Sequence, residues 1–311
     1  MSLETIADAR RPELPASGFV LLALVSLFWG LNWPGMKIVL TEMTVWWFRV
    51  LSVGAGAFGL LAIARLTTGR LLPTRREIGP TALCALFNIV GWHLCTAYGV
   101  SQMAAGRASI IAFTMPVWAA LLGTLLLGER MTGWKIAGLA LGLAGLGVLI
   151  GPELSNLSAA PVGAFFMLAA AASWALGTVL FKRFDWDSPV SLLIGWQLFI
   201  GLLAILPGAL ILEPAPNFAA LSVEAWLALA YLFALPMVFC QWAFFKVVRI
   251  FPAAIASIGT LAVPVIGVYS SALIIGEHAG WREATAMALI VAALSAVLVL
   301  PALLRGPSTR A

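Results

Sequence analysis

Long, unbroken apolar runs dominate the sequence, and they constrain the fold more than any other feature. Many of them reach the ~20 residues that a helix needs to cross the hydrocarbon core of a bilayer. Apolar residues make up 62% of the chain and charged residues 10%, against ~25% charged residues in an average soluble protein. An outer-membrane barrel is disfavoured because its strands alternate apolar and polar residues. The runs therefore predict an all-α polytopic membrane protein.

Charged residues and clusters of Pro, Gly and Asn divide the apolar sequence into ten predicted transmembrane helices. The loops between them are short, so they leave no room for a soluble domain. The predicted spans cover residues 17–40, 44–66, 78–100, 106–128, 133–151, 160–181, 189–212, 223–247, 252–275 and 283–304.

Lys and Arg residues are distributed unevenly over the predicted loops. With the N-terminus in the cytoplasm, fourteen of the 18 fall on the inner side, three fall on the outer side, and Arg49 lies within a span. An excess of Lys and Arg marks cytoplasmic loops. We therefore predict a multi-pass protein of the inner (plasma) membrane with both termini cytoplasmic. The same asymmetry accounts for the net charge of +5 without a nucleic-acid partner.

The second half of the chain repeats the first. Residues 108–130 match residues 256–278 at a shift of 148, with Pro116 on Pro264 and the sequence Gly-Glu recurring at the end of each copy. Each repeat holds five spans, and an odd number forces the second copy to insert upside down. Inverted repeats are common in secondary transporters, where the substrate site lies near the midplane between the halves.

This repeat sets the predicted domain organisation. A cytoplasmic N-terminal tail precedes a first five-helix repeat, which is followed by a second, inverted five-helix repeat and a cytoplasmic C-terminal tail. The boundaries are 1–16, 17–151, 152–304 and 305–311.

Several motifs resemble one known family when they are taken in order. They are Phe28-Trp29-Gly30-Leu31-Asn32-Trp33 in the first span, Arg49 in the second, Pro116 in the fourth and Gly128-Glu129-Arg130 at its end. Their order and spacing resemble those of the EamA-type drug/metabolite transporters, over nearly the whole chain. The resemblance implies ten helices in a 5+5 inverted arrangement, a central cavity lined mainly by spans 3, 4, 8 and 9, and export of metabolites. The Trp-rich pattern is similar to that of amino-acid exporters, including the aromatic amino-acid branch.

Ionisable groups within the spans are candidates for function, because charge is costly inside a bilayer. No Asp or Glu lies well inside a span, which disfavours a proton/cationic-drug antiporter. Arg49 either closes the outer side, through an ion pair or a helix-end hydrogen bond, or binds a substrate carboxylate. His93 is either a buried neutral histidine or a group that contacts substrate or protons. At the shift of 148 it matches Gln241, so these two polar groups are expected to flank the midplane.

Aromatic and amide side chains extend the predicted site. Asn88 and Trp92 are four residues apart and share a helix face, which either lines the cavity or makes interhelical hydrogen bonds. Trp29 and Trp174 match at a shift of 145 and fall near the midplane, where they either pack in the core or stack on substrate. The predicted substrate-binding residues are Trp29, Asn88, Trp92, His93, Tyr98, Trp174, Gln241 and Trp242.

Pro116 and Pro264 interrupt the backbone hydrogen bonds of two matched helices. Inside a bilayer the freed groups must be satisfied by protein or cavity water. We predict that Pro116 and Pro264, together with Arg49, act in gating or as hinges, and a static kink for packing is the alternative.

The predicted function is secondary export of small metabolites, best matched by amino acids, through alternating access. A uniporter, a channel-like facilitator and an exporter of other neutral amphiphilic compounds are the alternatives. A membrane-embedded enzyme is disfavoured, because the sequence offers only two histidines and no cluster of metal ligands. We predict a monomer whose partners are a small-molecule substrate and the lipid bilayer, with no cofactor and no metal.

Overall fold

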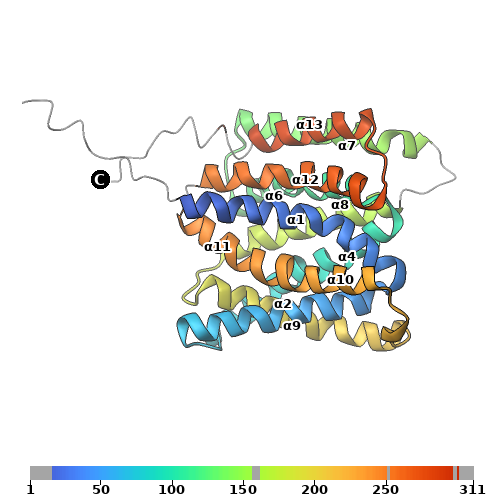
Figure 1. Cartoon of the computed structure of the whole chain (residues 1–311). Coiled ribbons are helices and arrows are strands. Elements are labelled where there is room, and N and C mark those ends of the chain that lie inside the picture. The colour runs from blue at the N-terminus through green and yellow to red at the C-terminus, as the bar shows by residue number, and fades with distance from the viewer. Residues whose placement is uncertain (1–15, 156–161, 251–252, 297–299, 301–311) are drawn as a thin grey trace, which may run out of the picture.

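The computed structural model describes residues 16–155, 162–250, 253–296 and 300, so the predicted tails fall almost wholly outside it. Its described residues form helices and no strand (Figure 1). The α-helices are α1 Ala16–Glu42, α2 Val45–Thr68, α3 Ile78–Ala85, α4 Trp92–Gln102, α5 Ala105–Ala112, α6 Met115–Leu127, α7 Gly133–Ser155, α8 Val162–Arg183, α9 Val190–Leu212, α10 Val223–Leu232, α11 Cys240–Ile250, α12 Ala253–Ile275 and α13 Trp281–Leu294.

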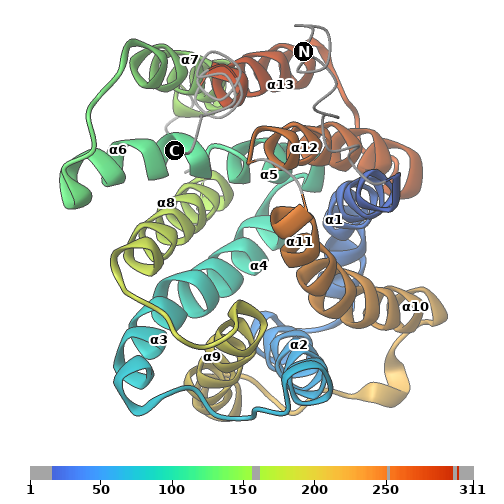
Figure 2. The ribbon, with the colours of Figure 1, turned by 90° about the vertical axis from the view of Figure 1, so that its left-hand side faces the viewer.

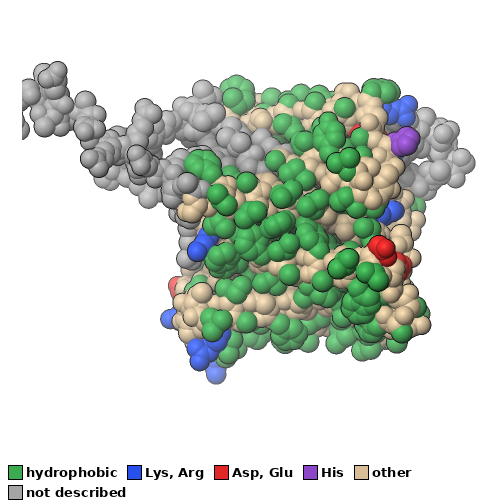
Figure 3. All heavy atoms as spheres, in the orientation of Figure 1, with side chains coloured by type: hydrophobic (Ala, Val, Ile, Leu, Met, Phe, Trp, Pro, Cys, Tyr) green, Lys and Arg blue, Asp and Glu red, His purple; other side chains and the backbone are tan. Residues whose placement is uncertain are grey.

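Within the described ranges, seven helical segments are long and apolar enough to cross a membrane. They are Ser17–Glu42, Val45–Thr68, Arg75–Gln102, Ala105–Leu127, Val162–Arg183, Val190–Leu212 and Val223–Phe244. Gly133–Leu149 and Ala262–Ile275 are shorter apolar helices. Figure 3 shows a face covered with hydrophobic side chains, with the charged side chains near its two ends. The predicted all-helical, multi-pass architecture is thus confirmed, whereas the count of ten spans stays a prediction.

Two segments contain π-helix at matching places in the two halves. Leu86–Gly91 joins α3 to α4, and Phe233–Phe239 joins α10 to α11. A π-helix leaves backbone carbonyls displaced from the regular α-helical pattern, and such segments often lie at functional sites. The Ser173 hydroxyl donates to the Phe87 carbonyl in the first π segment (2.8 Å). The Trp29 indole donates to the Pro236 carbonyl in the second (3.4 Å).

The matched prolines lie in different backbone settings. The fourth apolar run breaks between α5 and α6, and Pro116 lies in the first turn of α6, where its missing N–H costs no helical hydrogen bond. Pro264 lies inside the continuous helix α12. The hinge predicted at Pro116 would therefore have to act at the break between Ala112 and Met115.

The main helix pairs each join the first half of the chain to the second. An end-on view shows α7 beside α13 at one edge and α2 beside α9 at the opposite edge (Figure 2). Between these edges α1 packs on α12, and α8 packs on α4, α5 and α6. The largest buried apolar cluster lies where α1, α5, α10 and α12 meet, and it contains Trp33, Ile111, Leu232 and Val263.

The α1–α12 contact depends on a glycine. A Cβ atom added to Gly30 would lie 2.4 Å from Cγ2 of Ile266 and 3.3 Å from the Val263 carbonyl oxygen. We expect Gly30→Ala to lower the free energy of unfolding by ~1–3 kcal/mol, the usual cost of overpacking. Gly147→Ala on α7 is the matched control, because nothing lies within 4 Å of its added Cβ. Thermal unfolding of the detergent-purified protein measures both variants, and equal melting temperatures would contradict the close contact.

Candidate functional site

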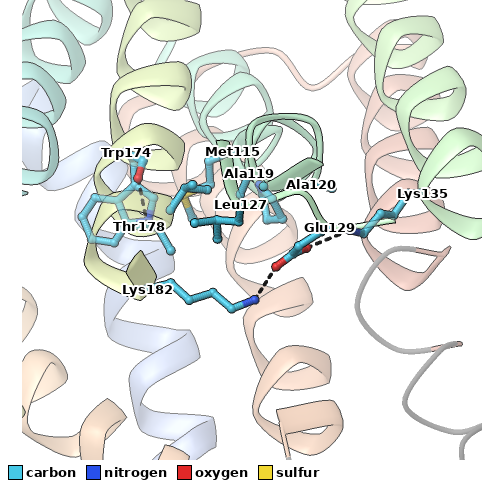
Figure 4. A pocket seen from close by; sticks show the side chains of 12 residues that line it. Met115, Ala119, Ala120, Leu127, Glu129, Lys135, Trp174, Thr178 and Lys182 are labelled. Carbon is cyan, nitrogen blue, oxygen red and sulfur yellow. Dashed lines mark hydrogen bonds and ion pairs between the residues drawn. The ribbon is translucent and has the colours of Figure 1, made fainter. Parts of the chain in front are cut away.

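A pocket of about 380 Å³ lies between α6 and α8, near the ends of these helices (Figure 4). Its walls are mostly apolar, and three charged side chains lie at one end. Two of the predicted residues, Pro116 and Trp174, are among those that line it. The full lining is Met115, Pro116, Ala119, Ala120, Gly123, Leu127, Glu129, Lys135, Trp174, Thr178, Val179 and Lys182.

Glu129 connects the two halves of the chain at the charged end of the pocket. Lys135 Nζ lies 2.8 Å from Glu129 Oε2, and Lys182 Nζ binds Oε1 of the same carboxylate. Figure 4 shows Glu129 between the two lysines. Hydrogen bonds from Lys135, and next from Lys182, lower the pKa of Glu129 to about 2. The carboxylate is therefore charged at every physiological pH.

This pKa predicts how the Glu129 contacts depend on pH. A carboxylate whose pKa falls from 4.5 to about 2 on folding contributes stability that is complete above 4.5 and is lost as the pH falls toward 2. We expect Glu129→Gln to lower the melting temperature equally between pH 5.5 and pH 8. The difference from wild type shrinks below pH 4.5. Glu224→Gln on the exposed face of α10 is the control. A difference that changes between pH 6 and pH 8 would contradict this assignment.

A pair of tryptophans connects the wall of the pocket to α4. Trp174 contacts Trp92, with ring centroids 5.0 Å apart and planes at 56°. Trp92 is the first residue of α4, and His93 follows it. His93 is buried, and its Nδ1 has no hydrogen-bond partner among the described residues. Two of the predicted site residues, Trp92 and Trp174, are thus in contact, and a third, His93, lies in the same turn of α4 as Trp92.

Arg49 on α2 is buried against neutral groups. Its Nη2 donates to Thr96 Oγ1 (2.8 Å) and to Met36 Sδ (2.9 Å). The guanidinium carbon lies 4.6 Å from the centroid of the Phe48 ring. Of the predicted structural roles, neither an ion pair nor a helix-end bond occurs in the described part of the chain: Nε has no acceptor there, and no carboxylate pairs with the guanidinium.

Thr96 links Arg49 to the aromatic pair. Its hydroxyl also bonds the backbone carbonyl of His93 (3.1 Å), and the His93 imidazole lies within electrostatic range of Arg49. Trp92 and His93 are therefore in one turn of α4, Thr96 is in the next turn, and Arg49 is on the adjacent helix α2. A buried cation with only neutral partners is energetically costly, and an anion beside it would offset that cost.

Asn88 has a buried partner that sequence reasoning missed. Its Nδ2 donates to Oε1 of Gln197 on α9 (3.2 Å). Both amides are buried, and each keeps one polar atom without a partner in the described residues, Asn88 Oδ1 and Gln197 Nε2. Gln197 could have been found as the one amide inside the apolar run 189–212. The contact matches the interhelical hydrogen bond that was one of the two roles considered for Asn88.

Three predicted residues lie on the other side of the molecule, where α1 meets α11. The Trp29 indole binds the Pro236 carbonyl. Trp242 packs beneath Lys246, whose Nζ lies 4.6 Å from the ring centroid. Gln241 is half-buried on α11. These three residues do not line the pocket between α6 and α8.

Tyr98 lies farther along α4, away from that pocket. Its hydroxyl accepts a hydrogen bond from the Trp46 indole (2.7 Å), and its ring stacks on Phe166 at 5.1 Å. Trp46 is in the first turn of α2, so these contacts tie the ends of α2, α4 and α8 together. Pro264 is buried within α12 and is likewise outside the pocket lining.

Comparisons with known proteins identify the same family as the sequence motifs. The EamA-like transporter family matches residues 16–151 and again 161–299. A probable amino-acid metabolite efflux pump of Salmonella typhimurium is 28% identical over 287 residues, which is 89% of this chain and 93% of that protein. The uncharacterized transporter YoaV of Bacillus subtilis is 26% identical over 254 residues, covering 80% of this chain and 86% of the relative.

A solved structure supports the fold independently. A crystal structure superposes with a TM-score of 0.63 at 19% identity, covering 93% of this chain and 99% of that chain. At this identity the likeness concerns the fold alone. The family match covers nearly the whole chain in two copies, and the relatives above are transporters and not enzymes. The predicted resemblance is therefore confirmed: this chain is a multi-pass membrane protein of the EamA-like transporter family.

Proposed function

We propose that this transporter exports amino acids and closely related zwitterionic metabolites, aromatic ones included, from the cytoplasm. Transport proceeds by alternating access between two inverted five-span halves of a monomer. The observation that carries the proposal is a series of contacts. Trp174 in the pocket wall contacts Trp92 on α4, and one turn later on α4 Thr96 binds the buried Arg49 guanidinium.

The packing of the helices supports two inverted halves. In the repeat, α8 is the counterpart of α1, and α5 with α6 is the counterpart of α12. The contact of α1 with α12 therefore corresponds to the contact of α8 with α5 and α6, and both contacts are present. In the α2–α9 and α7–α13 pairs, the two helices in contact are each other's counterparts. Because five proposed spans precede α8, it runs opposite to its counterpart α1. This arrangement suits carriers in which one half rocks against the other around a central site.

The charges support the direction of transport. The pocket opens beside Glu129, Lys135 and Lys182, at the end that carries most of the Lys and Arg residues. Such residues mark the cytoplasmic side, so both termini are assigned to the cytoplasm and the pocket is accessible to a cytoplasmic substrate.

The chemistry along this path suits a zwitterion with an apolar or aromatic side chain. Trp92 and Trp174 offer ring faces and edges for stacking. Arg49 offers a guanidinium that can bind a carboxylate with two parallel hydrogen bonds. The amide oxygen of Asn88 and the Nδ1 of His93, both without partners in the described chain, are potential acceptors for an ammonium group. The relatives named amino-acid metabolite efflux pumps agree with this class of substrate.

Counterflow in reconstituted vesicles tests the proposal. Vesicles preloaded with unlabelled phenylalanine, leucine or threonine should accumulate the labelled amino acid, whereas protein-free vesicles should not. Measurement at several pH values on each side separates uniport from proton exchange. Absence of counterflow for every amino acid would overturn the substrate class.

Trp174 provides a test of the site itself. We expect Trp174→Ala to reduce counterflow of phenylalanine about tenfold or more, since burying an aromatic ring contributes ~1.5–3 kcal/mol. The melting temperature should change little, because Trp174 is only half-buried. Trp134→Ala on the outer face of α7, where the ring is 43% exposed, is the control. Equal loss of transport in both variants would remove Trp174 from the site.

A further inference from the structure

Four glutamates bind the N-terminal ends of helices that belong to the other half of the chain. Glu42 accepts from the backbone N–H of Ser222 (2.7 Å), the N-cap residue of α10. Glu77 accepts from the backbone N–H groups of Asp187 and Ser188 (2.6 and 2.9 Å), in the turn that leads into α9. Glu213 accepts from the first turn of α2. Glu277 accepts from the first turn of α5. Helix N-termini carry unpaired N–H groups and partial positive charge, so a carboxylate stabilises them.

Glu129 is the exception to this pattern. It matches Glu277 at the shift of 148, and at that shift Ala105 and Gly106 match Ala253 and Ala254, the first residues of α12. Glu277 binds the N–H groups of Ala105 and Gly106 (2.7 and 2.9 Å). Glu129 instead binds Lys135 and Lys182.

Lys37 and Lys182, the lysines at matching positions in the two halves, also have different kinds of partner. Lys37 on α1 donates to the carbonyls of Val100 and Met103 (2.8 and 3.0 Å), at the end of α4, and is close enough to Glu277 for their charges to interact. Its counterpart at the shift of 145 is Lys182, which pairs with Glu129 at the charged end of the pocket. At one end of the molecule the two charges separately bind helix ends, and at the other they pair with each other.

We propose that these two Lys–Glu couples exchange arrangements when the transporter changes state. In the state described here, the Lys182–Glu129 pair holds the cytoplasmic pocket open, and Lys37 and Glu277 close the opposite end. In the opposite state, Glu129 binds the first turn of α12 and Lys182 the last turn of α11, while Lys37 pairs with Glu277. The four charged groups of the two couples therefore keep partners in both states.

Cysteine labelling tests the role of the open-state pair without any substrate. In a variant whose native cysteines are replaced, Thr178→Cys places a thiol in the pocket, where Thr178 is exposed. A membrane-impermeant maleimide added from the cytoplasmic side reports how often the pocket is open. We expect Glu129→Gln and Lys182→Gln to slow labelling about 1.4- to fivefold, the range that follows from ~0.2–1 kcal/mol for an exposed ion pair.

Arg183→Gln is the matched control, because the neighbouring Arg183 is exposed and carries the same charge. Its labelling rate should equal that of the parent. Unchanged rates in Glu129→Gln and Lys182→Gln would overturn the proposal, as would an equal decrease in Arg183→Gln, which would indicate a general effect of charge.

Cross-linking tests the alternative partner of Glu129. The pair Glu129→Cys and Ala254→Cys should form a cross-link that blocks labelling of the Thr178→Cys thiol. The pair Glu129→Cys and Lys182→Cys should cross-link and leave the pocket accessible. No cross-link to Ala254→Cys, or one that leaves labelling unchanged, would overturn the exchange. Neither labelling nor cross-linking depends on amino-acid transport. The proposed substrate class can therefore be wrong while the proposed exchange of ion pairs is right, and the exchange can be wrong while the substrate class is right.

Discussion

Replacing Arg49 with glutamine is expected to abolish the preference of the transporter for carboxylate substrates. A hydrogen bond to a charged group contributes ~1.5–3 kcal/mol, so loss of the guanidinium should reduce counterflow of phenylalanine about 10- to 100-fold. Counterflow of phenylalaninamide, which lacks the carboxylate charge, should change much less. A role of Arg49 in packing alone would reduce transport of both compounds equally.

Two further variants separate substrate recognition from folding. Arg49→Lys keeps the charge but loses the planar fork that matches a carboxylate, so it should retain part of the preference. Arg65→Gln, near the other end of the same helix, removes an exposed guanidinium that bonds only the local Gly69 carbonyl, and it should leave transport unchanged. If the ratio of phenylalanine counterflow to phenylalaninamide counterflow is the same in Arg49→Gln as in the wild type, the guanidinium does not bind the substrate carboxylate.

Replacing Glu77 with alanine is expected to cause the largest loss of stability. Its side chain is 1% exposed and accepts five hydrogen bonds, from the backbone and hydroxyl of Thr74, the backbone of Asp187, and the backbone and hydroxyl of Ser188. Removing one partner from a buried charged network costs ~3–5 kcal/mol. Thermal unfolding in detergent measures the loss.

Glu224 provides the comparison for this variant. It lies in the first turn of α10 but is exposed to solvent, so Glu224→Ala should change the melting temperature little. Glu77→Gln keeps the size and part of the hydrogen bonding, and its loss should be intermediate. Equal melting temperatures for Glu77→Ala and Glu224→Ala would contradict the structural role of Glu77.

The helices could be predicted from the sequence because the signal for each is local. Length and hydropathy of a single run determine whether it can span a bilayer, and the helix bounds follow the predicted runs closely. The break at Pro116 could not be predicted, because the same residue is compatible with a kink inside a helix and with the first turn of a new one.

The site could be predicted only in part, because its contacts depend on how helices that are far apart in the sequence pack against one another. The aromatic pair of Trp92 and Trp174 brings together two predicted residues. The Gln197 partner of Asn88 and the neutral partners of Arg49 depend on the placement of α9 and α4, which the spacing of residues along one helix does not determine. The role of Glu77 at a helix N-terminus had a local signal in the sequence, since Thr74 and Glu77 have the spacing of a capping box and form one.

The interleaving of the two halves has a consequence for biosynthesis. When the ribosome has released α7, the faces of α1, α2 and α4 that later contact α12, α9 and α8 still lack their partners. Asn88 lacks its hydrogen-bond partner until Gln197 on α9 has been made. Gly30 lacks its packing partner until Ile266 on α12 has been made. The nascent first half therefore remains in the membrane as an incompletely packed intermediate until translation is almost complete.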